Sequence, residues 1–476
     1  MAKKNRNDQV STPTAYVEEM LDRIGYRNHV VGETVLENSC GQGNILTSIV
    51  NRYIADAKKQ GLSKSDIVKG LENDITAFEI DRNQMESCIR RLDEICDREG
   101  LCRPVWNIKN QDFLKYDVNG IQASYVIGNP PYITYHDIEE EERKFLKEHF
   151  TVCKKGRFDY CYAFIEASIK AMDAGGKMVY LIPFSIFRNR YAQDLRKFIR
   201  SGTTGILDFS GRNVFPGITC SAAFLLYEKE AGQKKVVYQN IEEKITRIFE
   251  RNILASDGGK WVFSDTTEKT KRFGDYFCVH NSIATLLNEA FLISPKAEDE
   301  AAFLVGDGKV EREICLQAVS TRSAKKKEKK QYIIFPYKRN RKGVSRYTEN
   351  EFRELYPYAY QHIRQFEKKL SARKVDQHVK WFEYGRGQAL DSVWKEKLIL
   401  PMVITKQAKV YWADADTIPY AGYFVTLKEN TGYTLKDAER ILQSPVFYQY
   451  VKEVGTPTTE TSYRISVNDI KDYRFG

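Results

Sequence analysis

Residues 35–44 read Val-Leu-Glu-Asn-Ser-Cys-Gly-Gln-Gly-Asn, a short apolar run that ends in a Gly-x-Gly loop. The helical pattern of residues 45–57 follows directly. A strand, a glycine loop and a helix in this order let the backbone approach a ligand closely, although the same pattern also fits an ordinary strand–helix turn. The stretch therefore predicts the first strand and first covering helix of an α/β sheet.

Strands and helices alternate from this loop to about residue 227. The strand candidates are residues 75–80, 105–108, 125–127, 177–183, 206–209 and 222–227, and the helix candidates are residues 84–98 and 162–172. Such alternation predicts a mostly parallel sheet that is covered on both faces, a Rossmann-like α/β fold. Ligands bind such sheets at the carboxyl ends of the strands, so functional residues are expected there.

The composition changes after about residue 235, where the regular alternation stops. Residues 324–330 read AKKKEKK and residues 337–346 read YKRNRKGVSR, on either side of an apolar run at 332–336. Basic runs are commonly solvated loops, but this pair flanking a strand favours a face that contacts phosphates. We expect one domain at residues 1–240 and a second, α+β domain at 241–476.

The composition excludes several other classes of protein. The chain has 476 residues, a net charge of +10 and nine cysteines, none in a Cys-x-x-Cys pair. This argues against a disulfide framework and a zinc ribbon, and favours a reducing compartment. The polar N-terminus has no signal-peptide pattern, no apolar run approaches the length of a bilayer crossing, and no metal site is expected. We expect a cytoplasmic protein.

Residues 127–132, Ile-Gly-Asn-Pro-Pro-Tyr, follow an apolar strand and carry the most specific chemistry. The alternative is a rigid Pro-Pro turn. An aromatic amine is a poor nucleophile because its lone pair is delocalised into the ring. The side-chain oxygen of Asn129 and the carbonyl of Pro130, held by Pro131, can accept the hydrogens of such an amine, and Tyr132 offers a face for stacking. The motif predicts a pocket that methylates an amine.

Two acidic residues complete the pattern at later strand ends. Glu79 lies in Phe-Glu-Ile-Asp at residues 78–81, where an acid can accept the two hydroxyls of a ribose. Asp112 lies in Asn-Gln-Asp-Phe-Leu at residues 110–114, where it can accept from an adenine amino group while Phe113 packs on the ring. Each pattern alone is weak, but their order and strand-end positions reinforce one another.

Together these motifs resemble the amino-methylating DNA methyltransferases of restriction–modification systems, in the gamma arrangement. In that family the cofactor motifs precede Asn-Pro-Pro-Tyr, and a target-recognition domain follows. Residues 11–13, 157–166 and 213–216 resemble further family elements, whereas Asn38 stands where the family has proline. The resemblance implies a class I methyltransferase domain that uses S-adenosylmethionine, followed by a DNA target-recognition domain.

The family's site residues transfer to this chain position by position. The cofactor contacts would be Thr12 and Pro13 at the methionine end, Glu37, Ser39, Gly41 and Gly43 in the glycine loop, Glu79 and Ile80 at the ribose and adenine, and Asp112, Phe113, Phe164 and Asn129. The catalytic set would be Asn129, Pro130, Pro131, Tyr132 and Phe215, the last against an extruded adenine. Looser resemblance to the recognition domain lies at residues 280–285, 333–337, 356–360 and 384–387.

The sequence thus predicts methylation of the 6-amino group of an adenine flipped out of double-stranded DNA. Methylation of a protein glutamine, of RNA adenine or of the cytosine amine uses related chemistry, and a non-catalytic DNA-binding subunit is a further alternative. We expect a bacterial, nucleoid-associated enzyme that acts as a monomer on DNA. With the first cofactor element at Ser11, we expect no fused nuclease, and a separately encoded restriction endonuclease is a candidate partner.

Overall fold

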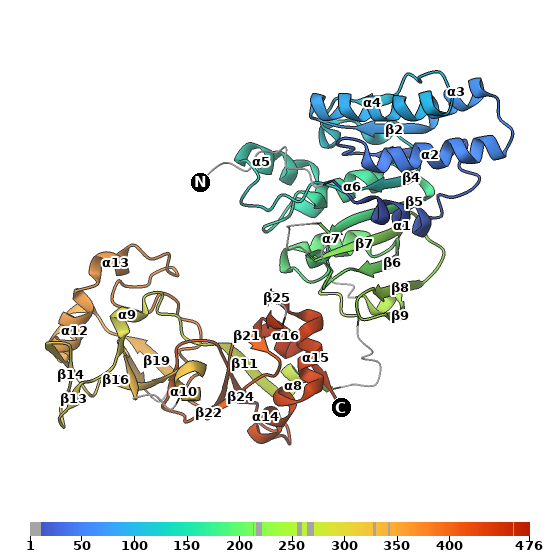
Figure 1. Cartoon of the computed structure of the whole chain (residues 1–476). Coiled ribbons are helices and arrows are strands. Elements are labelled where there is room, and N and C mark those ends of the chain that lie inside the picture. Colours follow the sequence, from blue (N-terminus) through green and yellow to red (C-terminus); the bar gives the residue numbers. More distant parts are fainter. Residues whose placement is uncertain are drawn as a thin grey trace. The chain divides into compact units, whose positions relative to one another are not determined.

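The computed structural model describes residues 11–212, 214–215, 221–254, 259–263, 271–326, 330–340, 343–459 and 461–476. The chain forms two compact units, Met1–Phe263 and Ser264–Gly476 (Figure 1). The boundary expected near residue 240 falls inside the first unit, because β8 (Lys235–Asn240) pairs with β6 (Thr203–Asp208) and β9 (Ile245–Glu250) pairs with β8. The division between the units therefore follows Phe263.

A nine-stranded sheet in the order β3-β2-β1-β4-β5-β7-β6-β8-β9 forms the centre of the first unit. Its other strands are β1 (Val35–Glu37), β2 (Ile75–Phe78), β3 (Asn107–Lys109), β4 (Ala123–Gly128), β5 (Met172–Pro183) and β7 (Ala222–Glu228). Strands β1 to β5 are parallel, whereas β7 runs antiparallel to both β5 and β6. The mostly parallel α/β sheet predicted from the sequence is confirmed.

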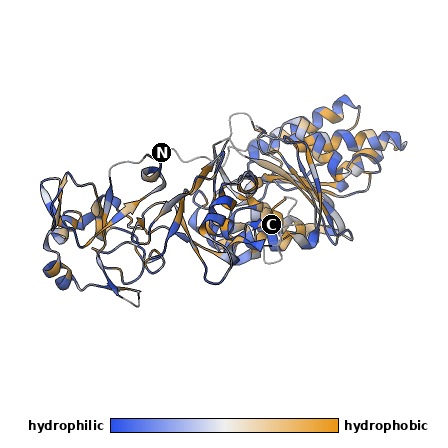
Figure 2. Ribbon diagram, turned by 90° about the horizontal axis from the view of Figure 1, so that it is seen from below, coloured by the Kyte–Doolittle hydropathy of each residue, from blue (hydrophilic) through white to orange (hydrophobic). Residues whose placement is uncertain are grey.

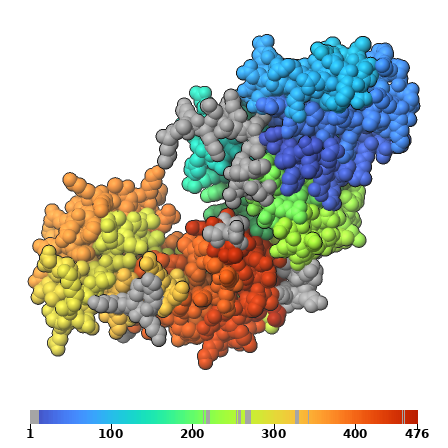
Figure 3. Space-filling model, in the orientation of Figure 1, coloured from blue at the N-terminus to red at the C-terminus, as the bar shows by residue number. Residues whose placement is uncertain are grey.

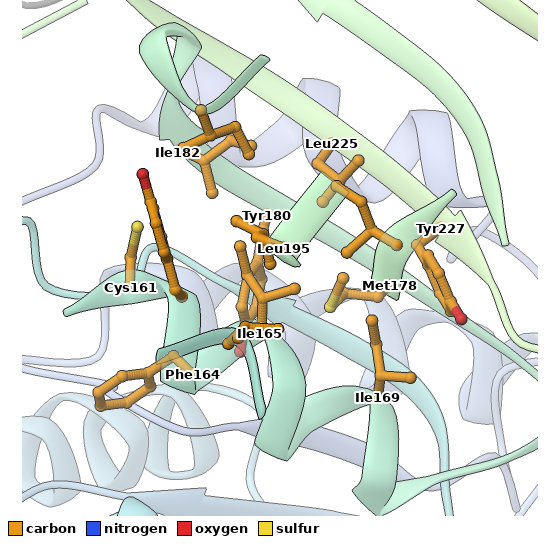
Figure 4. Close-up of a cluster of buried hydrophobic side chains, with 14 of the residues drawn as sticks. Cys161, Phe164, Ile165, Ile169, Met178, Tyr180, Ile182, Leu195, Leu225 and Tyr227 are labelled. Carbon is orange, nitrogen blue, oxygen red and sulfur yellow. The ribbon is translucent and has the colours of Figure 1, made fainter. Parts of the chain in front are cut away.

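Helices cover both faces of this sheet. They are α1 (Thr14–Ile24), α2 (Asn44–Lys59), α3 (Lys64–Asp74), α4 (Arg82–Arg98), α5 (Glu140–His149), α6 (Cys161–Ala171) and α7 (Gln193–Ile199). Successive side chains of a strand point to opposite faces, and β5 shows the result. Val179 and Leu181 pack in one core with α1, α2 and α4. Tyr180 packs in the other core with α6 and α7, as Figure 4 shows.

The second unit is built from small sheets and short helices, as expected for an α+β domain. Its strands are β10 (Lys271–Arg272), β11 (Phe277–Asn281), β12 (Leu292–Ile293), β13 (Ala297–Glu298), β14 (Ala302–Val305), β15 (Gly308–Glu311), β16 (Cys315–Val319), β17 (Gln331–Ile334), β18 (Tyr337–Asn340), β19 (Gly343–Arg346), β20 (Lys397–Leu400), β21 (Val403–Thr405), β22 (Tyr411–Ala413), β23 (Ile418–Pro419), β24 (Tyr423–Leu427), β25 (Thr456–Thr459), β26 (Ser462–Arg464) and β27 (Arg474–Phe475). Its helices are α8 (Phe273–Tyr276), α9 (Asn288–Phe291), α10 (Thr321–Lys326), α11 (Glu349–Leu355), α12 (Pro357–Arg364), α13 (Glu367–Ser371), α14 (Leu435–Gln443), α15 (Pro445–Val454) and α16 (Val467–Asp472).

Two separate hydrophobic cores divide the second unit into two lobes. One core gathers side chains such as Phe291, Ile334 and Phe382, and the other gathers side chains such as Phe277, Leu398 and Phe447. The space-filling view shows the lobes as a yellow-to-orange part and a red part (Figure 3). Hydrophilic and hydrophobic residues alternate along the helices of both units, as amphipathic elements on a core require (Figure 2).

Two requirements, that of a membrane-spanning helix and that of a metal site, can be compared with the described residues. None of their helices combines the length and apolarity needed to cross a bilayer. In the same part of the chain, no group of three or more histidine, cysteine, aspartate and glutamate side chains could hold a metal ion.

Candidate active site

The glycine loop and the Asn-Pro-Pro-Tyr segment lie side by side because they follow neighbouring parallel strands. β1 pairs with β4, and the chain leaves these strands after Glu37 and Gly128. The hydroxyl of Ser39 donates to the carbonyl of Asn129 at 3.3 Å. Two motifs that are far apart in the sequence therefore meet at one edge of the sheet.

The glycine loop has a backbone that only glycine suits. Gly43 has φ +81°, and a Cβ atom there would lie 2.5 Å from Sγ of Cys88 on α4. Gly41 also has a positive φ, of 53°. A side chain at position 43 would be strained and would also push α4 away, so glycine lets the loop pack closely against α4 where α2 begins.

Glu37 is a buried carboxylate with an unsatisfied oxygen. Its exposed fraction is 1%, and within the described residues its Oε2 has no hydrogen-bond partner. Burial, together with the nearby Cys88 and Glu79, raises the pKa of Glu37 well above its usual range. Buried polar atoms are normally paired, so an orphan at this edge indicates a missing ligand with a donor or a positive charge. S-adenosylmethionine carries both, and the residues present fit it.

Glu79 directly follows β2 and forms a hydrogen bond to the glycine loop. Its Oε2 accepts from the backbone N–H of Gly41 at 2.8 Å, and its Oε1 accepts from Asp81 N at 2.9 Å. Ile80 next to it is 58% exposed. Beyond β2, a rigid carboxylate and an open apolar side chain thus stand where a ribose and an adenine ring are expected.

The expected adenine pocket brings together Asp112, Phe113 and Phe164. Asp112 caps the 3-10 turn Phe113–Lys115 by accepting from Leu114 N at 3.1 Å, and Nζ of Lys115 lies 3.4 Å from its other oxygen. The rings of Phe113 and Phe164 are 5.9 Å apart between centroids. Phe164 points away from the β5 side chains in Figure 4. The three predicted residues thus converge, although only 2% of Phe113 is exposed.

The N-terminal Thr-Pro element joins the Asn-Pro-Pro-Tyr segment directly. Nδ2 of Asn129 donates to Oγ1 of Thr12 at 3.2 Å, and Nδ2 of Asn44 donates to the carbonyl of Thr12 at 3.3 Å. Thr12 is 3% exposed, and Pro13 precedes the first residue of α1. Thr12 thereby connects Asn129 to the start of α2.

The two aromatic residues expected to hold a base are neighbours. The rings of Tyr132 and Phe215 lie edge to face with centroids 6.3 Å apart. Pro130 is buried and Pro131 is half-buried, so the Pro-Pro step is fixed by packing. Asn213 and Pro216, the other named residues of the expected Phe215 element, lie outside the described residues.

Asn38, the departure from the family pattern, is anchored in the core. Its Nδ2 donates to Oγ of Ser168 on α6 at 2.7 Å and to the hydroxyl of Tyr180 on β5 at 2.5 Å. A Cβ atom on Gly128 would lie 3.0 Å from the ring of Tyr180. Asn38 therefore ties the glycine loop to the side chain that packs under the start of the Asn-Pro-Pro-Tyr segment. The sequence alone gave no indication of this contact.

Several stretches of the second unit that resemble a recognition domain are core instead of surface. The hydroxyl of Tyr384 donates to Ile334 O at 2.7 Å, and Tyr384 N donates to Tyr337 Oη at 2.9 Å. Three cations of the second basic run form ion pairs, Lys338 with Glu351 at 2.8 Å, Arg339 with Asp416 at 2.7 Å and Arg346 with Glu383 at 3.5 Å. The remainder of the two basic runs is described only in part.

Comparison with known proteins supports the predicted resemblance. Residues 48–215 match the family of the Eco57I restriction-modification methylase. The chain is 26% identical over 251 residues to the type II methyltransferase M.BstVI of Geobacillus stearothermophilus, covering 50% of this chain and 45% of that protein. It is 21% identical over 389 residues to the type II restriction enzyme and methyltransferase RM.Eco57I of Escherichia coli, covering 72% and 38%. The resemblance to restriction–modification methyltransferases is confirmed.

A solved structure shows the same fold. The type IIL restriction-modification enzyme MmeI, determined in complex with DNA, superposes over 96% of this chain and 64% of its own, with a TM-score of 0.56 and 13% identity. At this identity the likeness concerns the fold alone. The chain spans less than half the length of the two curated relatives described above.

Proposed function

We propose that the protein is an S-adenosylmethionine-dependent DNA methyltransferase that modifies the 6-amino group of adenine. The observation that carries the proposal is the hydrogen bond from Asn129 to Thr12 at the edge where the glycine loop lies. In this bond the nitrogen of the amide donates to the hydroxyl of Thr12. The oxygen is then the end that accepts from a substrate amine, which is the role that the chemistry requires.

The protein groups act on the adenine amine without a strong base. Asn129 Oδ1 and the carbonyl of Pro130 accept the two amine hydrogens, so the nitrogen becomes pyramidal and its lone pair is available. Tyr132 and Phe215 hold the ring, and the buried Pro-Pro step keeps the acceptors in place. Positioning and fixed dipoles therefore supply most of the rate acceleration.

The cofactor side of the site is formed at the ends of the first three strands, β1, β2 and β3. Bound S-adenosylmethionine supplies the electrophilic methyl group on its sulfonium. Glu37 offers the unsatisfied carboxyl oxygen, the loop at Gly41 and Gly43 offers a backbone without side chains, and Glu79 and Asp112 offer acceptors. These are the residues that would hold it.

The proposed substrate is duplex DNA because the relatives are enzymes of restriction–modification systems. The second unit would supply sequence recognition, through side chains that reach base edges in the major groove. The target base must leave the stack, since its amino group cannot otherwise reach a buried pocket. We further propose that the enzyme acts as a monomer on DNA and that a separately encoded restriction endonuclease is its partner.

The test is transfer of a labelled methyl group from S-adenosylmethionine to purified substrates. We expect incorporation into duplex DNA and recovery of N6-methyladenine after digestion to nucleosides. Label in N4-methylcytosine would contradict the choice of base. Label in RNA or in glutamine of a protein, but not in DNA, would contradict the choice of substrate.

A further inference from the structure

Four cations on two loops of the first unit have no acidic partner in the described part of the chain. Lys154, Lys155 and Arg157 lie on the loop before α6, and Arg190 begins the 3-10 turn Arg190–Ala192 after β5. All four are exposed, and among the described residues none forms an ion pair or a side-chain hydrogen bond. This differs from the basic run of the second unit, where Lys338 is paired with a carboxylate.

The two loops are held against each other by a glycine. Gly156 has φ +76°, and a Cβ atom there would lie 2.6 Å from Cδ1 of Tyr191. The tyrosine ring therefore packs directly on the backbone of the first loop, and 38% of Tyr191 stays exposed. The contact brings the charges of both loops to one surface.

The first of these loops is held against the segment that follows the residues of the proposed base pocket. The N–H of Tyr160 donates to the carbonyl of Ile133, the residue after Tyr132, at 2.9 Å. The rings of Tyr135 and Phe158 lie edge to face, 5.3 Å apart. The loop at 154–157 is thus anchored to the segment that directly follows the Asn-Pro-Pro-Tyr motif, and it leads into α6 (Figure 1).

We propose that Lys154, Lys155, Arg157 and Arg190, with Tyr191, contact the DNA phosphates that flank the extruded adenine. When a base is rotated into a pocket, its own backbone is drawn to the rim of that pocket, so the neighbouring phosphates need cations there. Unpaired lysine and arginine side chains bind phosphates without first breaking an ion pair, and arginine can do so in a bidentate manner. The inference deepens the proposed function and rests on it.

The test is the salt dependence of duplex binding by the full chain. The affinity for DNA falls as salt rises, and the slope of log affinity against log salt is negative. The double variant Lys154→Ala/Lys155→Ala should make this slope less steep by about 2, since each lost phosphate contact removes about 0.9. Arg157→Ala should make it less steep by about 1. Because the three side chains are exposed, binding of S-adenosylmethionine should stay unchanged, which would separate lost DNA contacts from a damaged fold.

The matched control is Lys64→Ala/Lys69→Ala on α3, which precedes the amino end of β2 and carries two exposed lysines. This variant should keep the wild-type slope. An unchanged slope in the 154/155 variant, with methylation by the wild-type protein intact, would overturn the phosphate surface and leave the proposed function standing. A wild-type protein that neither binds nor methylates DNA would overturn both.

Discussion

Nδ2 of Asn129 donates a hydrogen bond to Oγ1 of Thr12, across 3.2 Å and 117 residues of sequence. The bond joins the amide of the Asn-Pro-Pro-Tyr motif to the residue that also accepts, through its carbonyl, from Asn44 at the start of α2. An amide that is held by its nitrogen presents its oxygen in a fixed direction. The N-terminal element therefore holds the amide of the proposed catalytic acceptor in place.

Replacement of Thr12 tests this orientation. Thr12→Ala removes the acceptor, so the amide of Asn129 can rotate, and a lost hydrogen bond of roughly 0.5–1.5 kcal/mol predicts a kcat lower by about 2- to 13-fold. Thr12→Ser keeps the hydroxyl and should retain most of the activity. Steady-state kinetics on the methylated DNA would show the difference, and equal kcat values for the two variants would remove Thr12 from the mechanism.

Tyr132 is expected to stack on the extruded base. Tyr132→Ala should weaken capture of the base by roughly 1–3 kcal/mol, the range for aromatic–base stacking. Tyr132→Phe keeps the ring beside Phe215 and should act nearly as the wild type does. The measurement is affinity for target duplex together with the fluorescence of 2-aminopurine at the target position. Unaltered base exposure in the alanine variant would contradict the stacking role.

Glu37 should give the protein a characteristic dependence on pH. Its pKa is raised in the folded state, chiefly by burial, so the folded protein keeps a proton that the unfolded chain loses above about pH 4.3. The stabilisation is therefore fully present at low pH and decreases as pH rises. Glu37→Gln removes this dependence, and its free energy of unfolding relative to wild type should increase with pH.

The same variant should bind the positively charged S-adenosylmethionine more weakly, because a bound cation favours the ionised form of Glu37 and a glutamine cannot ionise. Chemical denaturation over a pH series and calorimetric titration would measure the two effects. Parallel pH profiles for wild type and Glu37→Gln would show that Glu37 is not the titrating group. Unchanged cofactor affinity would remove it from the cofactor site.

Asn38 should contribute to stability through its buried amide. Asn38→Ala leaves the hydroxyls of Tyr180 and Ser168 bonded only to each other, at 2.6 Å, and should lower the free energy of unfolding by roughly 1–3 kcal/mol. Asn83→Ala, at an exposed position on α4, is the control and should change it by less than about 0.5 kcal/mol. Urea denaturation compares them, and equal losses would contradict the anchoring of Asn38.

The sequence predicted the elements whose signals are local. The apolar runs before Gly41 and Asn129 form strands as expected, and Glu79 directly follows a strand as expected. The contact between Thr12 and Asn129 and the burial of Asn38 could not be predicted, because they join elements far apart in the chain. Such pairs are fixed by packing, which leaves no periodic pattern in the sequence.

The sequence next to the predicted domain boundary contains a strand pattern that the predicted boundary did not take into account. Residues 235–238 alternate between exposed and buried side chains, Lys235 and Val237 outward and Val236 and Tyr238 inward, as in a strand with one face covered by the core. The alternation continues in residues 245–250, so following the period-2 pattern past residue 240 would have kept β9 in the first unit. In the second unit, the sequence around Tyr384 resembles a recognition motif. In the structure its ring is buried and its hydroxyl donates a hydrogen bond to Ile334 O, so packing accounts for an aromatic residue at this position.

The most direct test is methylation of unmodified bacterial genomic DNA by the purified chain with S-adenosylmethionine, read by single-molecule sequencing. Asn129→Ala serves as the matched control, and it should bind the cofactor but transfer no methyl group. The account predicts N6-methyladenine at one recurring short sequence with the wild-type protein and none with the variant. No methylated base from a wild-type protein that binds the cofactor, or equal methylation by Asn129→Ala, would contradict it.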